Sequence, residues 1–300
     1  MHSVNRGTLS AAAAYAMWGL LPIYWKLLPD VPALQTTSHR VIWSFAFLWV
    51  IIALRRSSRD LLSVMKWRTL AIYLVAGSLL AVNWLTYIWA VTSGHVLESS
   101  LGYFINPLVN VLLGMLFMNE RLRPWQWVSV GVAAAGVLYL TMSYGRLPWI
   151  ALVLAVSFGL YGLSKKLAPL GALYGLTLET SILFLPALVY LVTVAAQGNG
   201  AFGRVSSLQT ALLVLTGIVT SVPLLLFSEG ARRIPLTLLG VLQYISPTLQ
   251  FLLGTLVYAE PFSLQRLAGF AAIWGALAIY TAESIAARRR EQATQPLPPE

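Results

Sequence analysis

His39 and Glu179 are ionisable residues that each lie inside a long apolar segment of the sequence. Each lies roughly two helical turns from the start of its segment, which corresponds to a depth on the order of 10 Å. An ionisable side chain at such a depth in a bilayer usually serves solute binding, proton transfer or ion pairing. We therefore interpret both residues as candidates for contact with a solute, and Glu179 also as a candidate proton carrier.

Amide and hydroxyl side chains recur at helical spacing in two other apolar segments. Tyr103, Asn106 and Asn110 lie three and four residues apart, so they share one face of a helix. The residues 140 positions later along the chain are also polar, namely Gln243, Ser246 and Gln250. Such stripes can line a solute cavity, or they can hydrogen-bond between helices during assembly. We favour the cavity, because intramembrane polarity is most useful along a solute path.

Both polar stripes contain a proline, Pro107 in the first and Pro247 in the second. A proline inside a helix removes one backbone hydrogen bond and weakens the helix locally. We expect the two proline-containing helices to be moving parts of a gate.

Aromatic residues accompany these polar groups. Tyrosine and tryptophan at the ends of membrane helices usually anchor the protein at the interface, whereas deeper rings supply stacking surface for an apolar solute. Arg40 is expected to pair with Asp30 near the rim of the membrane. The predicted substrate-binding residues are Trp18, His39, Trp43, Asn83, Tyr87, Tyr103, Asn106, Tyr161, Glu179 and Gln243.

Ten apolar segments must position these side chains, and each is near the roughly 20 residues that a helix needs to cross a bilayer. The first is longer than the apolar part of a signal peptide, so we expect it to be kept as a helix. The sequence therefore predicts an all-α integral membrane protein with ten transmembrane helices. The segments are 8–28, 34–54, 69–92, 97–118, 124–142, 147–164, 173–196, 208–228, 236–258 and 264–285.

The composition agrees with a membrane protein. Of the 300 residues, 58% are hydrophobic and 10% are charged, whereas a soluble domain carries roughly 25% charged residues. The net charge of +10 comes from basic residues in short loops between apolar segments. That placement indicates membrane topology, and nucleic acid is not an expected partner.

The basic residues gather in alternate loops. Fifteen lysines and arginines fall on one side of the predicted segments, in the two terminal regions and four loops, against three on the other side. The positive-inside rule then predicts that both termini are cytoplasmic, in a bacterial inner membrane.

The two halves of the chain resemble each other at a shift of 140 residues. Between 101–120 and 241–260, seven of twenty positions are identical, including Pro107 with Pro247 and Glu120 with Glu260. Each half holds five segments, so the second half must enter the membrane from the opposite side, as in many alternating-access transporters. We predict two inverted five-helix repeats around a central cavity, over 1–142 and 143–287, and a disordered cytoplasmic tail over 288–300.

Three stretches, 39–44, 99–110 and 157–162, resemble the RarD branch of the EamA-type drug/metabolite transporters. The resemblance covers essentially the whole chain and implies ten helices, inverted halves and a central cavity. It also implies kinship with exporters of aromatic and other amino acids, and with proteins linked to drug resistance. Small multidrug relatives use a glutamate in their first helix, but segment 8–28 has no acidic residue. That difference argues against proton-coupled export of cationic drugs by their mechanism.

These observations predict a secondary transporter that exports small amphipathic metabolites, with amino acids, including aromatic ones, as the expected substrates. We expect a monomer in contact with membrane lipid. The alternatives are a multidrug efflux carrier, a channel or a membrane-embedded enzyme. An enzyme would need a reactive constellation, but the sequence has no cysteine and only three scattered histidines. Neither a metal nor a cofactor is expected.

Overall fold

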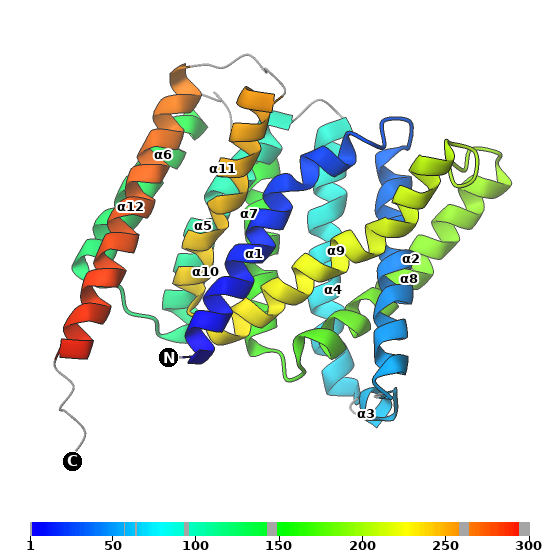
Figure 1. The fold of residues 1–300 in the computed structure, drawn as a ribbon, viewed down its shortest axis with the longest axis horizontal. Helices are drawn as coiled ribbons and strands as arrows, with labels where there is room; N and C mark the ends of the chain where they lie inside the picture. The colour runs from blue at the N-terminus through cyan, green and yellow to red at the C-terminus, as the bar shows by residue number, and fades with distance from the viewer. Residues whose placement is uncertain are drawn as a thin grey trace.

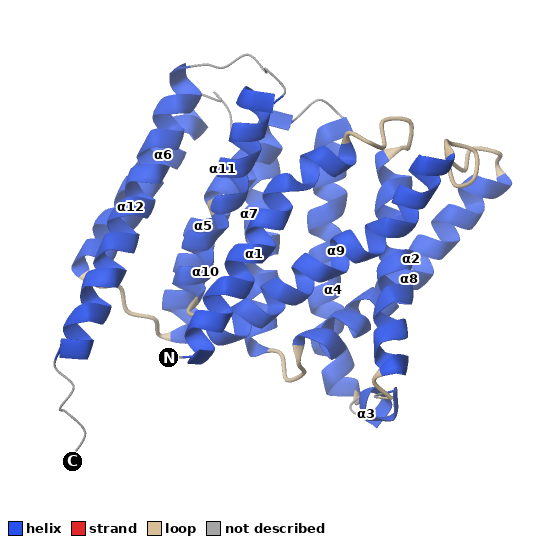
Figure 2. Cartoon of the chain, viewed as in Figure 1, coloured by secondary structure: helices blue, strands red, loops and turns tan. Residues whose placement is uncertain are grey.

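The computed structural model describes residues 2–56, 58–63, 65–92, 96–142, 149–257 and 264–293. Helices account for nearly all of this described chain (Figure 2). In order they are α1 (His2–Trp25), α2 (Ala33–Leu54), α3 (Ser58–Ser63), α4 (Trp67–Thr92), α5 (Val96–Met118), α6 (Pro124–Met142), α7 (Trp149–Leu167), α8 (Ala172–Ala196), α9 (Ser207–Arg233), α10 (Leu236–Gln243), α11 (Ile245–Leu252), the π-helical segment η1 (Leu253–Val257) and α12 (Leu264–Ala293).

The all-α membrane class predicted from the sequence is confirmed. Each predicted apolar segment coincides with a helix or, for 236–258, with α10, α11 and η1 in succession. Five described helices are long and apolar enough to cross a bilayer: α2, α4 over Trp67–Tyr87, α7, α8 and α9.

One interruption and several helix ends differ from the prediction. The segment 236–258 is interrupted at Tyr244, between α10 and α11. Pro247 has no N–H to donate to the carbonyl of Gln243, so the helix is weakest at this point. At the other end of the chain, α12 continues to Ala293. Residues 288–293, predicted as part of a disordered tail, are therefore helical, and 294–300 lie outside the described residues.

Helix directions place several chain segments at the same end of the molecule. The start of α1, the short helix α3, the α7–α8 turn and the last turn of α12 lie at the lower end in Figure 1. The α1–α2 turn and the α8–α9 connection lie at the upper end. Side chains near the start of α2 and near the start of α8 are consequently at opposite ends of the helices.

Helix positions recur along the chain. The helices α4, α5 and α6 begin at residues 67, 96 and 124, and α9, α10 and α12 begin at 207, 236 and 264, each 140 residues later. The contacts between helices also repeat when each helix is replaced by its equivalent in the other half. Thus α5 packs on α7 as α10 and α11 pack on α1, and α2 packs on α9 as α8 packs on α4. The predicted boundary at 142/143 adjoins residues outside the described ranges.

The helices bury one part of their surface and leave an apolar part exposed. On α8, the stretch from Gly175 to Thr180 is buried, whereas Leu185, Val189 and Val192 are exposed on one face. A contiguous exposed apolar face on a long helix is typical of contact with lipid. Close packing between α2 and α9 depends on Gly217, where a Cβ atom would lie 2.4 Å from the backbone carbonyl of Trp43.

Candidate functional site

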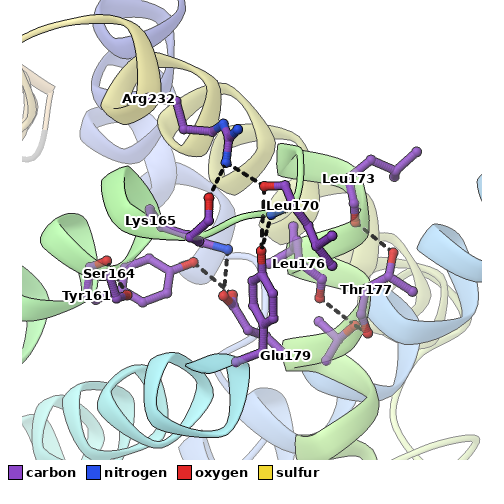
Figure 3. Close-up of polar contacts among 12 residues, drawn as sticks. Tyr161, Ser164, Lys165, Leu170, Leu173, Leu176, Thr177, Glu179 and Arg232 are labelled. Carbon is purple, nitrogen blue, oxygen red and sulfur yellow. Dashed lines mark hydrogen bonds and ion pairs between the residues drawn. The ribbon is translucent and has the colours of Figure 1, made fainter. Parts of the chain in front are cut away.

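Glu179 of α8 is held by two donors from α7. The Nζ of Lys165 lies 2.6 Å from Oε1 of Glu179, and the hydroxyl of Tyr161 donates to Oε2 at 3.1 Å. Figure 3 shows both donors pointing at the carboxylate. The exposed fraction is 0% for Glu179 and Tyr161 and 3% for Lys165. Burial this complete leaves the opposite charges to neutralise each other without help from water.

Local sequence explains why these three groups meet. Tyr161 and Lys165 are four residues apart, so they share one face of α7. A short turn reverses the chain into α8, where Glu179 lies two turns from the start and faces back toward α7. The ammonium group of Lys165 also lies 5.3 Å from the ring centroid of Tyr161 and 5.9 Å from that of Tyr73. Two aromatic faces and one carboxylate thus stabilise the buried cation.

The α7–α8 turn beside the ion pair is held by two other helices. Arg232 of α9 donates to the carbonyls of Ala168 and Leu170, at 2.6 and 2.5 Å (Figure 3). The backbone N–H of Leu170 donates to the hydroxyl of Tyr73, on α4, at 3.0 Å. Groups from α4 and α9 therefore fix the geometry in which Lys165 faces Glu179.

Aromatic rings from three helices continue from the ion pair into the middle of the molecule. The ring of Tyr161 stacks on Phe227 of α9, with 5.9 Å between centroids and 9° between planes. Phe158 of α7 contacts both rings, and Trp18 of α1 contacts Phe158 at 5.6 Å and Phe227 at 5.5 Å. We name this set the central site: Trp18, Phe158, Tyr161, Lys165, Glu179 and Phe227. Three predicted residues, Trp18, Tyr161 and Glu179, meet in it.

The predicted amides lie between helices. Asn83 of α4 donates to the carbonyl of Leu154 at 2.9 Å and to Ser157 at 3.0 Å. Asn106 of α5 donates to the carbonyl of Ala155 at 2.6 Å. These bonds join α4 and α5 to α7, which matches the assembly alternative raised by the sequence.

The two polar stripes contact each other through Asn110. Its amide nitrogen lies 3.1 Å from Oδ1 of Asn106 and 3.2 Å from Oε1 of Gln243. The α5 and α10 backbones approach closely here, since a Cβ on Gly240 would lie 2.7 Å from the carbonyl oxygen of Pro107. Unlike the segment with Pro247, α5 runs through Pro107 without a break. Asn110 and Gln243 thus meet at the packed interface between α5 and α10, whereas Gln250 of the second stripe donates to the carbonyl of Trp18 on α1 at 3.3 Å.

The remaining predicted residues lie apart from the central site. His39, near the start of α2, stacks on Phe202 of the α8–α9 connection at 5.1 Å, and Trp43 lies 6.0 Å from the same ring. Tyr87 and Tyr103 meet edge to face at 5.9 Å. His39 and Glu179, which are equivalent at the 140-residue shift, lie near the starts of α2 and α8. These two helix starts are at opposite ends of the molecule (Figure 1).

The predicted Arg40–Asp30 pair is wrong. Arg40 Nε donates to the hydroxyl of Thr220 on α9 at 2.9 Å. Asp30, in the α1–α2 turn, instead accepts a hydrogen bond from Gln209 at 2.8 Å. The first turn of α9 lies beside the α1–α2 turn and supplies this closer partner.

Sequence reasoning missed Lys165. The predicted segment 147–164 ends just before this residue, but α7 continues to Leu167 and buries the Lys165 side chain. The signal that could have found it is the pair Tyr161 and Lys165, four residues apart, followed by an intramembrane acid in the next apolar segment. The acid offers a counter-ion for the lysine, which allows the lysine to be buried at the end of a membrane helix.

Two hollows in the described part of the chain are lined by residues outside the central site. A small crevice between α5, α6, α10 and α12 has mainly apolar walls and includes Pro107. An open groove lies beside Arg123, Trp125 and Glu283. The rings of the central site pack against one another between α1, α7 and α9, with Trp18 and Phe158 partly buried. The described residues contain no group of three His, Asp or Glu side chains that could hold a metal ion.

Known proteins resemble this chain over nearly its whole length. The profile of the EamA-like transporter family matches residues 5–142. The uncharacterized transporter YojE of Bacillus subtilis is 46% identical over 95% of this chain and 96% of its own length. The protein RarD of Streptomyces exfoliatus is 46% identical over 96% of this chain and 91% of its own length. A crystal structure of another protein superposes with a TM-score of 0.70, covering 92% of this chain and 97% of that one at 22% identity, and so shares the fold.

Proposed function

Because this chain belongs to the EamA-like transporter family, alongside the RarD proteins, we propose that it is a secondary carrier that exports small amphipathic metabolites by alternating access. Amino acids, aromatic ones included, are the proposed substrates. Its full-length relatives are transporters, which decides between transport and enzyme catalysis.

Alternating access is supported by the internal repeat. Helix starts recur at a shift of 140 residues, and helix contacts recur with the halves exchanged. The family profile also ends at residue 142, the predicted end of the first half. We propose inverted halves over 1–142 and 143–287, in a monomer with ten transmembrane helices. Rocking of the halves would expose the packed central site to either side of the membrane in turn.

We propose that both termini and α3 are cytoplasmic in a bacterial inner membrane. The start of α1, α3 and the end of α12 share one end of the molecule (Figure 1). Basic residues cluster at that end in and beside α3, including Arg55, Arg56 and Arg59. The positive-inside rule assigns such an end to the cytoplasm. The central-site ion pair would then lie toward the cytoplasmic side.

The observation that carries the substrate proposal is the contact between the Lys165–Glu179 pair and the aromatic rings. One cation and one anion lie 2.6 Å apart, and Tyr161 links them to Phe227 and Trp18. An amino acid has the same pair of charges, so its carboxylate can exchange onto Lys165 and its ammonium group onto Glu179. A large apolar side chain then packs among the rings.

The same arrangement disfavours other solutes. A phosphate ester or sugar nucleotide needs several cationic groups, whereas the central site has one lysine that Glu179 neutralises. A permanent cation needs an unpaired carboxylate in a dry pocket, but Glu179 is already bound to Lys165. Solutes with balanced charges and an apolar body fit best.

The test is transport by purified protein in liposomes. Labelled phenylalanine, tryptophan, threonine and a quaternary ammonium dye are each offered to vesicles with and without protein. We expect saturable transport of the amino acids, with the aromatic ones preferred over threonine, and little transport of the dye. Transport of the dye alone, or of none of the amino acids, would contradict the amino-acid proposal and favour drug efflux or another metabolite.

A further inference from the structure

Arg40 has an aromatic environment on both sides of its guanidinium group. Its Cζ lies 5.0 Å from the ring centroid of Trp25 on α1 and 4.7 Å from that of Trp84 on α4. Nε donates to Thr220 of α9 at 2.9 Å. Three helices thus position this one guanidinium, a rigid fork suited to binding a carboxylate with two hydrogen bonds.

Within the described residues, no carboxylate lies within ion-pair distance of Arg40. Asp30 is bound to Gln209. The hydroxyls of Tyr24, Tyr87 and Tyr103 lie near enough to Arg40 to influence its charge. A charged arginine about 10 Å from the start of its helix is costly inside a membrane. Aromatic faces offset part of that cost, and an anionic ligand would offset more.

The 140-residue shift gives an internal comparison. Trp25 corresponds to Lys165, and His39, next to Arg40, corresponds to Glu179. In the second half, Lys165 and Glu179 neutralise each other. In the first half, an aromatic ring stands at the lysine position and Arg40 keeps an unneutralised charge. The two ends of the molecule thus differ: one holds a complete ion pair, and the other holds a cation between rings.

We propose that Arg40 binds the carboxylate of the transported solute at an outer site formed with Trp25, Trp84, Tyr87, Tyr103 and Thr220. The ligand class is a small carboxylate with an apolar body, such as an aromatic amino acid. The rings of Tyr87 and Tyr103, which contact each other at 5.9 Å, supply apolar surface and hydroxyl donors. The inference rests on the proposed function. It adds a second binding site, which lies nearer the opposite end of the molecule from the Lys165–Glu179 pair.

The experiment compares a carboxylate with its neutral amide. Purified protein binds labelled phenylalanine, and unlabelled phenylalanine or phenylalaninamide displaces it. For the wild type we expect the amide to compete at least about tenfold more weakly, as expected for loss of a charge-assisted hydrogen bond. Arg40→Gln should reduce this discrimination by roughly threefold or more, and Arg40→Lys, which keeps the charge but loses the fork, by less. Arg68→Gln removes an exposed arginine and should leave the ratio unchanged.

The outcomes separate the two proposals. An acid-to-amide ratio that stays at the wild-type value in both Arg40 variants would overturn the outer site while leaving the transport function intact. If Arg40→Gln does not yield monodisperse protein, the ratio in Arg40→Lys decides. A wild-type protein that neither binds nor transports any amino acid would overturn the proposed function, and the outer site with it.

Discussion

Lys165 and Glu179 form a buried ion pair across the α7–α8 turn, with 2.6 Å between Nζ and Oε1. Neither group is more than 3% exposed. Such a pair is weak grounds for stability, because desolvation of two charges offsets their attraction. A role in binding is a stronger reason for placing opposite charges beside an aromatic cluster.

Removing one partner should destabilise the protein more than removing both. We expect Lys165→Met or Glu179→Leu alone to lower stability by about 3–5 kcal/mol, because a single buried charge is left unpaired. The double variant should regain most of that stability. Substrate transport should be lost in all three variants, as measured in liposomes beside thermal unfolding in detergent.

The control is the partly exposed Glu229–Arg233 pair, four residues apart on α9. Glu229→Gln should change stability by less than about 1 kcal/mol. Wild-type transport by the Lys165→Met, Glu179→Leu double variant would show that the buried pair has a structural role only.

Shortening Trp18 should reduce preference for aromatic solutes. Trp18 contacts Tyr15, Phe158 and Phe227, and each ring contact contributes about 0.5–1.5 kcal/mol. We expect Trp18→Ala to weaken apparent phenylalanine affinity roughly 2- to 10-fold, with a smaller effect on threonine. Competition against labelled substrate measures the apparent affinities for phenylalanine and threonine. Trp125→Ala, at an exposed position, is the matched control. An equal loss of affinity for phenylalanine and threonine would show that Trp18 does not select aromatic substrates.

Replacing Pro247 by a residue with a backbone N–H should slow transport. Pro247→Ala supplies an N–H for the carbonyl of Gln243 and so favours one continuous helix in place of α10 and α11. Transport rate should fall more than expression. Pro107→Ala should have the smaller effect, since α5 is already continuous. Initial rates per amount of protein measure the change, and wild-type rates in both variants would exclude proline-based gating.

The proposed topology predicts that residue 62, in α3, and the end of the chain are cytoplasmic. Fusions at both points should be active with a reporter that works in the cytoplasm and inactive with one that requires the periplasm. A fusion in the α8–α9 connection, at residue 200, should show the reverse. Periplasmic activity at residue 62 or at the C-terminus would overturn the orientation.

Apolar segments of about 20 residues are sufficient to predict the long helices, whereas the short helix α3 lies between two predicted segments. The apolar segments fall on helices because a membrane span must satisfy its backbone hydrogen bonds internally, whatever its tertiary contacts. The helix ends were less predictable. The apolar pattern of 236–258 does not reveal the interruption at Tyr244, and Lys165 reads as a loop residue until α7 is seen to bury it.

The site was only partly predictable, because polarity in a membrane segment does not specify what the polar group faces. Glu179 and Tyr161 were recognisable as intramembrane polar residues, but their meeting depends on the α7–α8 turn. Asn106 and Gln243 had the same sequence signature, yet the structure uses them in hydrogen bonds between helices. Arg40 lost its predicted partner because Gln209, far away in sequence, lies closer to Asp30.

The most direct test of the account is counterflow of phenylalanine. Liposomes containing the protein are loaded with unlabelled phenylalanine and diluted into buffer with a trace of labelled phenylalanine. A carrier that exposes one site alternately predicts a transient, saturable accumulation of label inside, absent from protein-free vesicles. No accumulation, or a flux that rises linearly with concentration without saturating, would contradict an alternating-access carrier for amino acids.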